Sequence, residues 1–425
     1  MGVSRGGSAA APAPLDLTMD VFYWLARIAA HFRGIASEES LPSPSHVPYP
    51  PSSGLSVIIP SRNGKDLLAA QLPGILADLP PAAEVIVVDN GSDDGTAKWL
   101  RSEYSAVMTE VSPEPLGFAR AINRGLARAR FARVCLLNND MLIEPGFFTA
   151  LDAAFAQVPD LFCATAQIRF PAGVRREETG KAVMRQEGPT DFPIRCDEPL
   201  PGEDLTWVLY GSGGCSLYDA EKLRALGGVD EVYDPAYVED LDLGYRAWMR
   251  GWPSVYVAGA LVEHRHRATT SRYYREDELA LLLEINYLKF LARAVESPVL
   301  FGRLWLENLE RLQATGQIAA LKAAAGIALR WGRRFRPPAT GQRPVLLSED
   351  ALLALTDGSV ACFPGRGAKP PLVIASEQFE APSPELIEGH RQVIVVRGSE
   401  ESFAFRAAGL LLGGQVINRK HKLPE

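Results

Sequence analysis

The stretch VCLLNNDMLIEPG, Val134 to Gly146, decides the fold of this chain. Four apolar residues of strand length end abruptly in Asn138, Asn139 and Asp140, and a new element begins after them. In open α/β sheets, ligands bind just beyond the carboxyl ends of the strands, so a carboxylate placed there suits a phosphate-bound metal ion. The alternative interpretation is that Asn-Asn-Asp only forms a turn and caps the next helix.

The residues upstream repeat a pattern of strand, polar loop and helix. Leu55 to Pro60 and Glu84 to Val88 are short apolar runs, and a polar loop and a helical stretch follow each of them. A third helix is expected from Pro115 to Arg130, directly before the quoted stretch. Strands that are apolar throughout are typical of a parallel sheet with helices on both faces. Such a sheet would bring the carboxylates of Asp89 and Asp140 to the same edge.

The composition narrows the class of protein. The 425 residues suffice for two or three domains, and 47% hydrophobic with 22% charged residues is ordinary for a globular protein. The net charge of -7 argues against a nucleic-acid partner. Five scattered cysteines without a CxxC pair suit a reducing compartment and no structural zinc. With no recognisable secretory signal and no apolar run long enough to span a bilayer, the sequence predicts a cytoplasmic protein.

Several segments together resemble one known family. They are SVIIPSRNG (56–64), VVDNGSDDGT (87–96), GFARAINRG (117–125), LLNND (136–140), GSGGCSLYDAEKLRALGGVDE (211–231), YVEDLDLGYRAWMRGW (237–252) and VEHRH (262–266). In order and spacing they are similar to the inverting glycosyltransferases of family 2, over roughly residues 54–270. The resemblance implies an α/β protein of GT-A fold, which is a Rossmann-like, mostly parallel central sheet flanked by helices. No GxGxxG follows the first strand, and no P-loop motif is present.

The resemblance also implies a site for a nucleotide-sugar donor, with a uridine or thymidine base. Asp89, with Gly91 in the same loop, would contact the base. The loop after the first strand would hold the nucleoside, and it consists of Pro60, Ser61, Arg62 and Asn63. An alternative class, the nucleotidyltransferases, would need a basic glycine-rich loop at that point, whereas residues 60–64 carry only Arg62.

The triplet Asn138-Asn139-Asp140 stands where the family carries its DXD motif. By that resemblance Asn138 lies at the nucleotide, and Asp140 binds the Mg²⁺ or Mn²⁺ ion on the donor diphosphate. The first carboxylate of the motif is lost, as in a subgroup that resembles rhamnosyltransferase-like transferases of cell-surface glycans. His264 is implied as a further metal ligand or diphosphate contact, with His266 as the alternative.

An inverting transfer needs a base that takes the proton of the acceptor hydroxyl. The resemblance of Glu239-Asp240 to the family's ED motif implies that Asp240 is the base and that Glu239 supports it. Acidic residues that begin a helix also complement its dipole, and this is the alternative interpretation. Gly213, Gly214 and Asp242 are expected on the acceptor side. Asp242 and Arg246 are four residues apart, so a helix would pair them.

The acceptor side is also expected to include the segment from Phe170 to Leu205. This segment is rich in proline, glycine and charge and lacks periodicity, so we predict a mobile loop there.

Outside residues 54–270 the sequence predicts three further regions. The first is 1–53, with an amphipathic helix from Leu15 to Ile35 and a proline-rich linker after it. Phe22, Leu25, Ile28 and Phe32 lie near one face of that helix, which would pack on its own domain or on a bilayer. The second is a helical region, 271–340, and the third a small α/β accessory region, 341–425. The helices are expected at 277–295, 300–313 and 318–335, the strands at 371–376, 392–397 and 415–418, and a last helix at 403–412.

The last helix of the 271–340 region ends in Arg330, Arg333, Arg334 and Arg336 beside Trp331. This basic end has two interpretations, a peripheral contact with an anionic membrane surface or arginines that complement the helix dipole.

The sequence therefore predicts an inverting, metal-assisted transferase. It would move a sugar from a nucleotide-diphosphate donor to a glycan or lipid-linked acceptor in cell-surface polysaccharide synthesis, at the inner face of the cell membrane. The alternative is a catalytically weakened module that binds nucleotide sugars and scaffolds a polysaccharide assembly complex.

Overall fold

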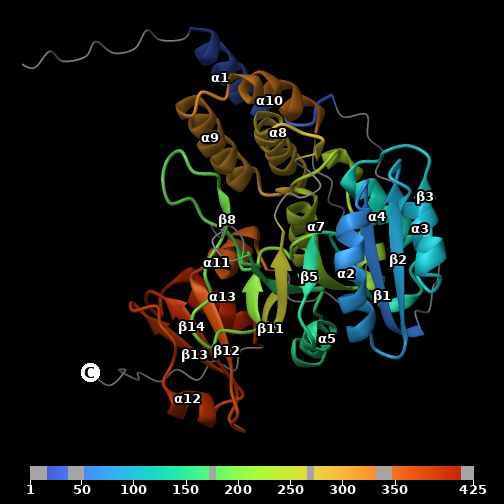
Figure 1. Cartoon of the computed structure of the whole chain (residues 1–425). Helices are drawn as coiled ribbons and strands as arrows, with labels where there is room; N and C mark the ends of the chain where they lie inside the picture. The colour runs from blue at the N-terminus through green and yellow to red at the C-terminus, as the bar shows by residue number, and fades with distance from the viewer. Residues whose placement is uncertain (1–16, 37–51, 172–178, 266–271, 332–346, 413–425) are drawn as a thin grey trace, which may run out of the picture.

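The computed structural model describes residues 17–36, 52–171, 179–265, 272–331 and 347–412. A nine-stranded mixed sheet forms its centre, in the order β3-β2-β1-β4-β10-β6-β11-β5, and β9 also pairs with β11 (Figure 1). The strands are β1 (Ser52–Ser61), β2 (Ala83–Asn90), β3 (Met108–Ser112), β4 (Phe131–Leu137), β5 (Met141–Ile143), β6 (Cys163–Arg169), β9 (Thr206–Val208), β10 (Cys215–Asp219) and β11 (Ser254–His264).

The three apolar runs that the sequence marked as strands are parallel neighbours. β1 pairs with β2, where Ser61 lies opposite Asp89, and with β4, where Ile58 lies opposite Leu136. Alternate residues of these strands belong to two separate buried clusters, one on each face of the sheet. The prediction of a mostly parallel α/β sheet covered on both faces is therefore confirmed.

Helices cover both faces of this sheet. They are α2 (Lys65–Asp78), α3 (Thr96–Glu103), α4 (Phe118–Leu126), α5 (Phe147–Gln157), α6 (Ala220–Ala225) and α7 (Glu239–Trp248). The helix expected from Pro115 to Arg130 is shorter than predicted and is α4 alone. Ser52 and Ser53, which were expected in the linker, belong to β1.

A helical layer follows the sheet in sequence and packs beside it. It contains α8 (Glu276–Ala294), α9 (Pro298–Ala314) and α10 (Ile318–Arg330), and α1 (Leu17–Ala30) joins it from the other end of the chain (Figure 1). Trp305 Nε1 donates to Ala26 O at 3.2 Å, and Gln313 Nε2 donates to Asp20 Oδ1 at 2.6 Å. No helix within the described ranges combines the length and apolar composition that crossing a bilayer needs.

The helix α1 packs on its own protein, but not through the expected face. Tyr23, Ala26 and Ala29 are the buried residues, whereas Leu25, Ile28 and Phe32 are exposed. Both faces carry apolar side chains, so the periodicity of the sequence could not choose between them.

The last part of the chain forms a small three-stranded sheet with the order β12-β14-β13. Its elements are α11 (Glu349–Thr356), β12 (Val360–Pro364), β13 (Leu372–Ser376), α12 (Pro384–Gly389), β14 (Gln392–Arg397) and α13 (Phe403–Leu411). The sequence predicted β13, β14 and α13 but not β12. The expected strand at 415–418 lies outside the described residues, as do Arg333, Arg334, Arg336 and His266.

Candidate active site

The loops that follow β1 and β2 are bonded to each other at the carboxyl edge of the sheet. Asn63 N donates to Ser92 Oγ at 2.9 Å, and Asp93 N donates to Asn63 Oδ1 at 2.8 Å. Asp89 Oδ1 accepts from Ser92 N at 3.2 Å, and this carboxylate is buried. The loop 60–63 and the loop that contains Asp89 and Gly91 therefore form one rigid wall, where the sequence placed the nucleoside.

The arginine of this wall has an aromatic partner. The Arg62 guanidinium lies 3.9 Å from the centre of the Tyr273 ring, and Tyr273 OH contacts Arg62 O at 3.5 Å. A cation held against an aromatic face is fixed in place while its N–H groups stay available at the ring edge.

The first two residues of the Asn138-Asn139-Asp140 triplet tie the end of β4 to its surroundings. Asn139 Nδ2 donates to Ser61 Oγ at 2.9 Å, and Asn138 N donates to Gly214 O at 2.8 Å. A Cβ atom at Gly64 would lie 2.3 Å from Asn139 Nδ2, and one at Gly214 would lie 2.5 Å from Asn138 Nδ2. A side chain at either position would therefore have to displace one of these asparagine side chains. The side-chain amide of Asn139 and the backbone N–H of Asn138 thus have structural partners, and Asp140 supplies the carboxylate.

The structure brings Asp140 and His264 together, as the sequence predicted. Met141 pairs with His264 across β5 and β11, and Arg265 N donates to Asp140 O at 2.9 Å. His264 Nε2 lies 3.6 Å from Asp140 Oδ2, and both side chains are buried. Phe170 packs beside the imidazole, with 5.6 Å between the ring centres.

This pair fits a metal ion that is shared with a substrate. Within the described residues, no group of three or more His, Cys, Asp or Glu side chains is placed to hold an ion alone. Mg²⁺ commonly binds through one or two carboxylates together with the phosphates of the substrate. One carboxylate oxygen and one imidazole nitrogen fit that mode better than a cage built from protein ligands alone.

Asp240 lies near the start of α7, beside the glycine pair. Gly213 N donates to Asp240 Oδ2 at 3.2 Å, and Leu241 N donates to Asp240 Oδ1 at 2.8 Å. The helix N-terminus favours negative charge at this position. Tyr237 and Val238, just before the acidic cluster, have φ values of 73° and 77°. Non-glycine residues adopt such values at a cost, which usually marks a functional site.

Glu239 differs from its neighbour because it is fully buried. Burial, and then the charge of Asp240, raise the pKa of Glu239 well above its ordinary value. Its Oε2 has no hydrogen-bond partner among the described residues. Because burial disfavours the charged form that a base needs, Glu239 is the less suited of the two neighbouring carboxyl groups to take up a proton.

The pKa of Glu239 makes the stability of the protein depend on pH. Because its folded pKa is raised above the unfolded value of 4.5, its contribution is present below pH 4.5 and is lost as the pH rises toward the folded pKa. Glu239→Gln, which mimics the neutral form, should therefore unfold like wild type in acid and be more stable at alkaline pH. The gap should grow by up to about 1.4 kcal/mol per pH unit in urea titrations. A variant less stable than wild type at pH 8 would mean that the folded pKa of Glu239 is not raised.

Asp242 does not fit the acceptor role that we expected. Its side chain is buried, Arg246 Nε donates to its Oδ2 at 2.6 Å, and Tyr233 OH donates to its Oδ1 at 3.1 Å. The predicted pairing with Arg246 is confirmed, and both carboxylate oxygens of Asp242 accept hydrogen bonds from within the protein. Its role is to fix α7 to the preceding loop.

Sequence reasoning missed Asn286, which holds the loop before the acidic cluster. This fully buried side chain on α8 directs Nδ2 at the carbonyl oxygens of Tyr233, Ala236 and Tyr237, at 2.7, 2.9 and 3.1 Å. A buried amide that contacts three carbonyls positions the backbone that carries Asp240. The available signal was a lone asparagine between the apolar residues Ile285 and Tyr287.

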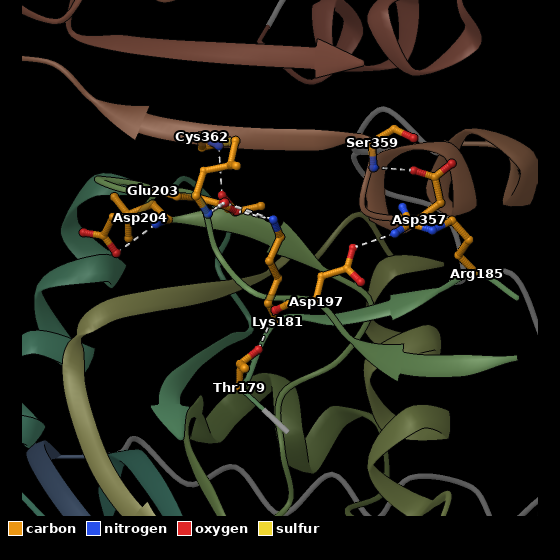
Figure 2. Close-up of polar contacts among 12 residues, drawn as sticks. Thr179, Lys181, Arg185, Asp197, Glu203, Asp204, Asp357, Ser359 and Cys362 are labelled. Carbon is orange, nitrogen blue, oxygen red and sulfur yellow. Dashed lines mark hydrogen bonds and ion pairs between the residues drawn. The ribbon is translucent and has the colours of Figure 1, made fainter. Parts of the chain in front are cut away.

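The segment expected as a mobile acceptor loop is anchored where the structure describes it. Residues 179–205 contain the hairpin of β7 (Ala182–Met184) and β8 (Ile194–Cys196). Figure 2 shows that Lys181 and Glu203 form an ion pair, with Nζ 2.9 Å from Oε2 and both side chains almost fully buried. The described part of this segment therefore contains regular structure, and its mobility stays a prediction.

Residues of the last part of the chain also form hydrogen bonds with this segment. Arg185 Nη1 donates to Asp357 O at 2.9 Å, and Figure 2 shows these two residues side by side. Cys362 N donates to Thr206 Oγ1 at 2.8 Å. Asp204 N donates to Cys362 O at 2.9 Å. The C-terminal sheet therefore supports the stretch that leads directly into the glycine pair at 213 and 214.

The fold and this geometry define an α/β protein with its ligand edge at the carboxyl ends of the strands. Residues 50–278, more than half of the chain, match the model described as glycosyltransferase like family 2. The chain belongs to this family and is a glycosyltransferase. The predictions of family 2, of the GT-A architecture and of an enzyme are confirmed.

Two relatives are similar over much of their own length. N-acetylglucosaminyl-diphospho-decaprenol L-rhamnosyltransferase of Mycobacterium tuberculosis is 30% identical over 230 residues, which cover 47% of this chain and 74% of the relative. Validoxylamine A glucosyltransferase of Streptomyces hygroscopicus subsp. limoneus is 27% identical over 317 residues, which cover 67% of this chain and 68% of the relative.

Two solved structures have a related fold. GalNAc-T7 with UDP, GalNAc and Mn²⁺ has a TM-score of 0.46 and 16% identity, covering 56% of this chain and 47% of that one. This chain thus spans about half the length of GalNAc-T7. S. aureus TarS 1-349 in complex with UDP-GlcNAc also has a TM-score of 0.46 and 16% identity, covering 61% of this chain and 73% of that one.

Proposed function

We propose that this enzyme transfers a sugar, with inversion, from a UDP- or dTDP-sugar to a glycan or lipid-linked acceptor of cell-surface polysaccharide synthesis. One observation carries the proposal. Gly213 and Gly214 connect the residues proposed for the donor with the proposed base. Gly214 O accepts from Asn138 N at 2.8 Å, and Gly213 N donates to Asp240 Oδ2 at 3.2 Å. The residues proposed for donor and acceptor chemistry are therefore held in a fixed relation.

In the proposed reaction, Asp240 takes the proton of the acceptor hydroxyl as its oxygen attacks the anomeric carbon. A bond forms between that oxygen and the anomeric carbon, and the bond from this carbon to the diphosphate oxygen breaks on the opposite face. A divalent cation, when bound, neutralises the charge of the leaving diphosphate. Asp140 and His264 would hold that cation, and the wall of residues 60–63 and Asp89 would hold the nucleoside.

The name of the rhamnosyltransferase relative supports the lipid-linked acceptor, because it specifies a decaprenol diphosphate that carries a sugar. We accordingly place the enzyme in the cytoplasm, at the inner face of the membrane. We assign residues 54–270 to the catalytic domain, 1–53 and 271–340 to flanking helical regions, and 341–425 to an accessory region.

The experiment that tests this function is a donor panel of UDP-, dTDP- and GDP-sugars with Mg²⁺ or Mn²⁺, and with EDTA. We expect turnover that EDTA abolishes and that excess metal restores. Asp140→Asn should raise the metal concentration needed for half-maximal rate at least about tenfold, because it removes a charged ligand. Glu144→Gln is the matched control, since this exposed acid lies four residues further along. Nucleotide binding without turnover of any donor would favour the scaffold alternative instead.

A further inference from the structure

The exposed face of α1 and of the turn after it is an apolar stripe. It consists of Val21, Trp24, Leu25, Ile28, Phe32 and Ile35, which are between 50% and 72% exposed. Of the twelve large apolar side chains that are exposed among the described residues, these six lie within fifteen consecutive positions. Isolated apolar residues are normal on a protein surface, but a contiguous group marks an interaction site.

The stripe is narrow and continuous. At about 100° per residue, its four helical members fall within a sector about 100° wide, opposite the buried face of Tyr23, Ala26 and Ala29. Figure 1 shows α1 at the end of the molecule that lies farthest from the C-terminal sheet. The stripe is therefore presented outward, away from the anchored segments of the active site.

Basic side chains flank the stripe. Arg27 and His31 line a pocket between α1 and α9, together with Phe301 and Trp305, whereas Arg33 in the same pocket donates to the carbonyl oxygens of Ala292 and Val295. The Arg27 guanidinium lies 5.0 Å from the centre of the Trp24 ring, so the cation sits at the edge of the apolar surface. This local positive charge contrasts with the net charge of -7 for the chain.

The end of α10 adds a further cation beside the stripe. Gly34 N donates to Ala328 O at 2.9 Å, and Ala36 N donates to Leu329 O at 3.0 Å. These bonds place the exposed Arg330 next to the end of the stripe. Asp20 is the only acidic residue in the described range 17–36, and its Oδ1 accepts from Gln313.

We infer that α1 docks on a bilayer of anionic lipids, with the stripe in the interface and the flanking cations at the headgroups. An interfacial helix has this apolar face, basic flank and aromatic residue at headgroup level. A second copy of the chain fits less well, because a twofold contact through the stripe would bring like charges together. The inference rests on the proposed lipid-linked acceptor, which such docking would place within reach of the enzyme.

The test is flotation of the full chain with vesicles that contain neither donor nor acceptor. We expect wild type to float with phosphatidylglycerol vesicles, to float less in high salt, and to float little with phosphatidylcholine alone. Leu25→Glu combined with Ile28→Glu should lower binding at least about tenfold, since both side chains leave the lipid. Phe403→Glu combined with Leu410→Glu, on the exposed face of α13, is the matched control and should float like wild type.

Three results would overturn the inference. They are wild type that floats with neither kind of vesicle, α1 variants that float like wild type, and wild-type dimers that the α1 variants convert to monomers. Hydrolysis of the donor in solution is measured on the same samples, and the α1 variants should retain it. An α1 variant that no longer floats but still hydrolyses the donor has therefore lost membrane docking and has kept the proposed chemistry.

Discussion

Replacing Asp240 by asparagine is expected to lower the rate of sugar transfer by about 10²–10⁴-fold, the usual contribution of a positioned base. Asparagine matches aspartate in size, and its single oxygen can still accept a hydrogen bond from Gly213 N or Leu241 N. It cannot take the proton of the acceptor hydroxyl. The fold and the donor site should persist, because the other residues that shape α7 and the glycine pair are unchanged.

The measurement is the transfer rate at saturating donor, with nucleotide affinity determined separately by calorimetry. Glu239→Gln is the matched control at the adjacent position and should keep most of the activity, since burial raises the pKa of that group and glutamine mimics its uncharged form. If the Asp240 variant transfers sugar at nearly the wild-type rate, the base lies elsewhere. If both variants lose activity equally, the two carboxyl groups act together and the proposed division of roles is wrong.

The parts of the fold that could be predicted are those that local pattern determines. β1, β2 and β4 are continuous apolar runs, because a central parallel strand is buried on both faces. β3 was missed because MTEVS is a short, partly exposed edge strand with only two apolar residues, and β12 because VACFP is short and ends in proline. For α1 the helix itself was predictable, but the buried face was not, because the choice depends on how α9 and α10 pack.

The residues of the candidate site also differ in whether a local pattern of the sequence predicts them. Asp89 and His264 lie at the ends of strands, Asp140 follows one, and Asp240 lies in the first turn of a helix, so the sequence marks them. The groups that fix these residues come from remote segments, as Asn286 does, and no local pattern encodes such contacts. Asp242 shows the opposite error, because an acidic residue in a catalytic motif is as easily a buried structural partner as a contact to substrate.

Breaking the Lys181–Glu203 ion pair with Lys181→Met should lower the free energy of unfolding by about 3–5 kcal/mol, as measured by urea denaturation. Methionine fills most of the space, so the effect comes from a buried carboxylate that loses its cation and keeps only hydrogen bonds such as that from Leu200 N. Arg169→Met, which breaks an exposed pair with Glu144, is the control and should change the free energy of unfolding by less than about 1 kcal/mol.

A double variant separates charge from packing at this pair. Lys181→Met combined with Glu203→Leu removes both charges, and we expect it to recover most of the stability that the single variant loses. A double variant no more stable than Lys181→Met alone would show that the loss came from packing. The ion pair anchors the segment that leads into Gly213 and Gly214, so Lys181→Met should also lower the rate of sugar transfer. The double variant should recover that rate together with its stability. Stability and activity would then change together, which is expected only if the anchored segment positions the catalytic groups.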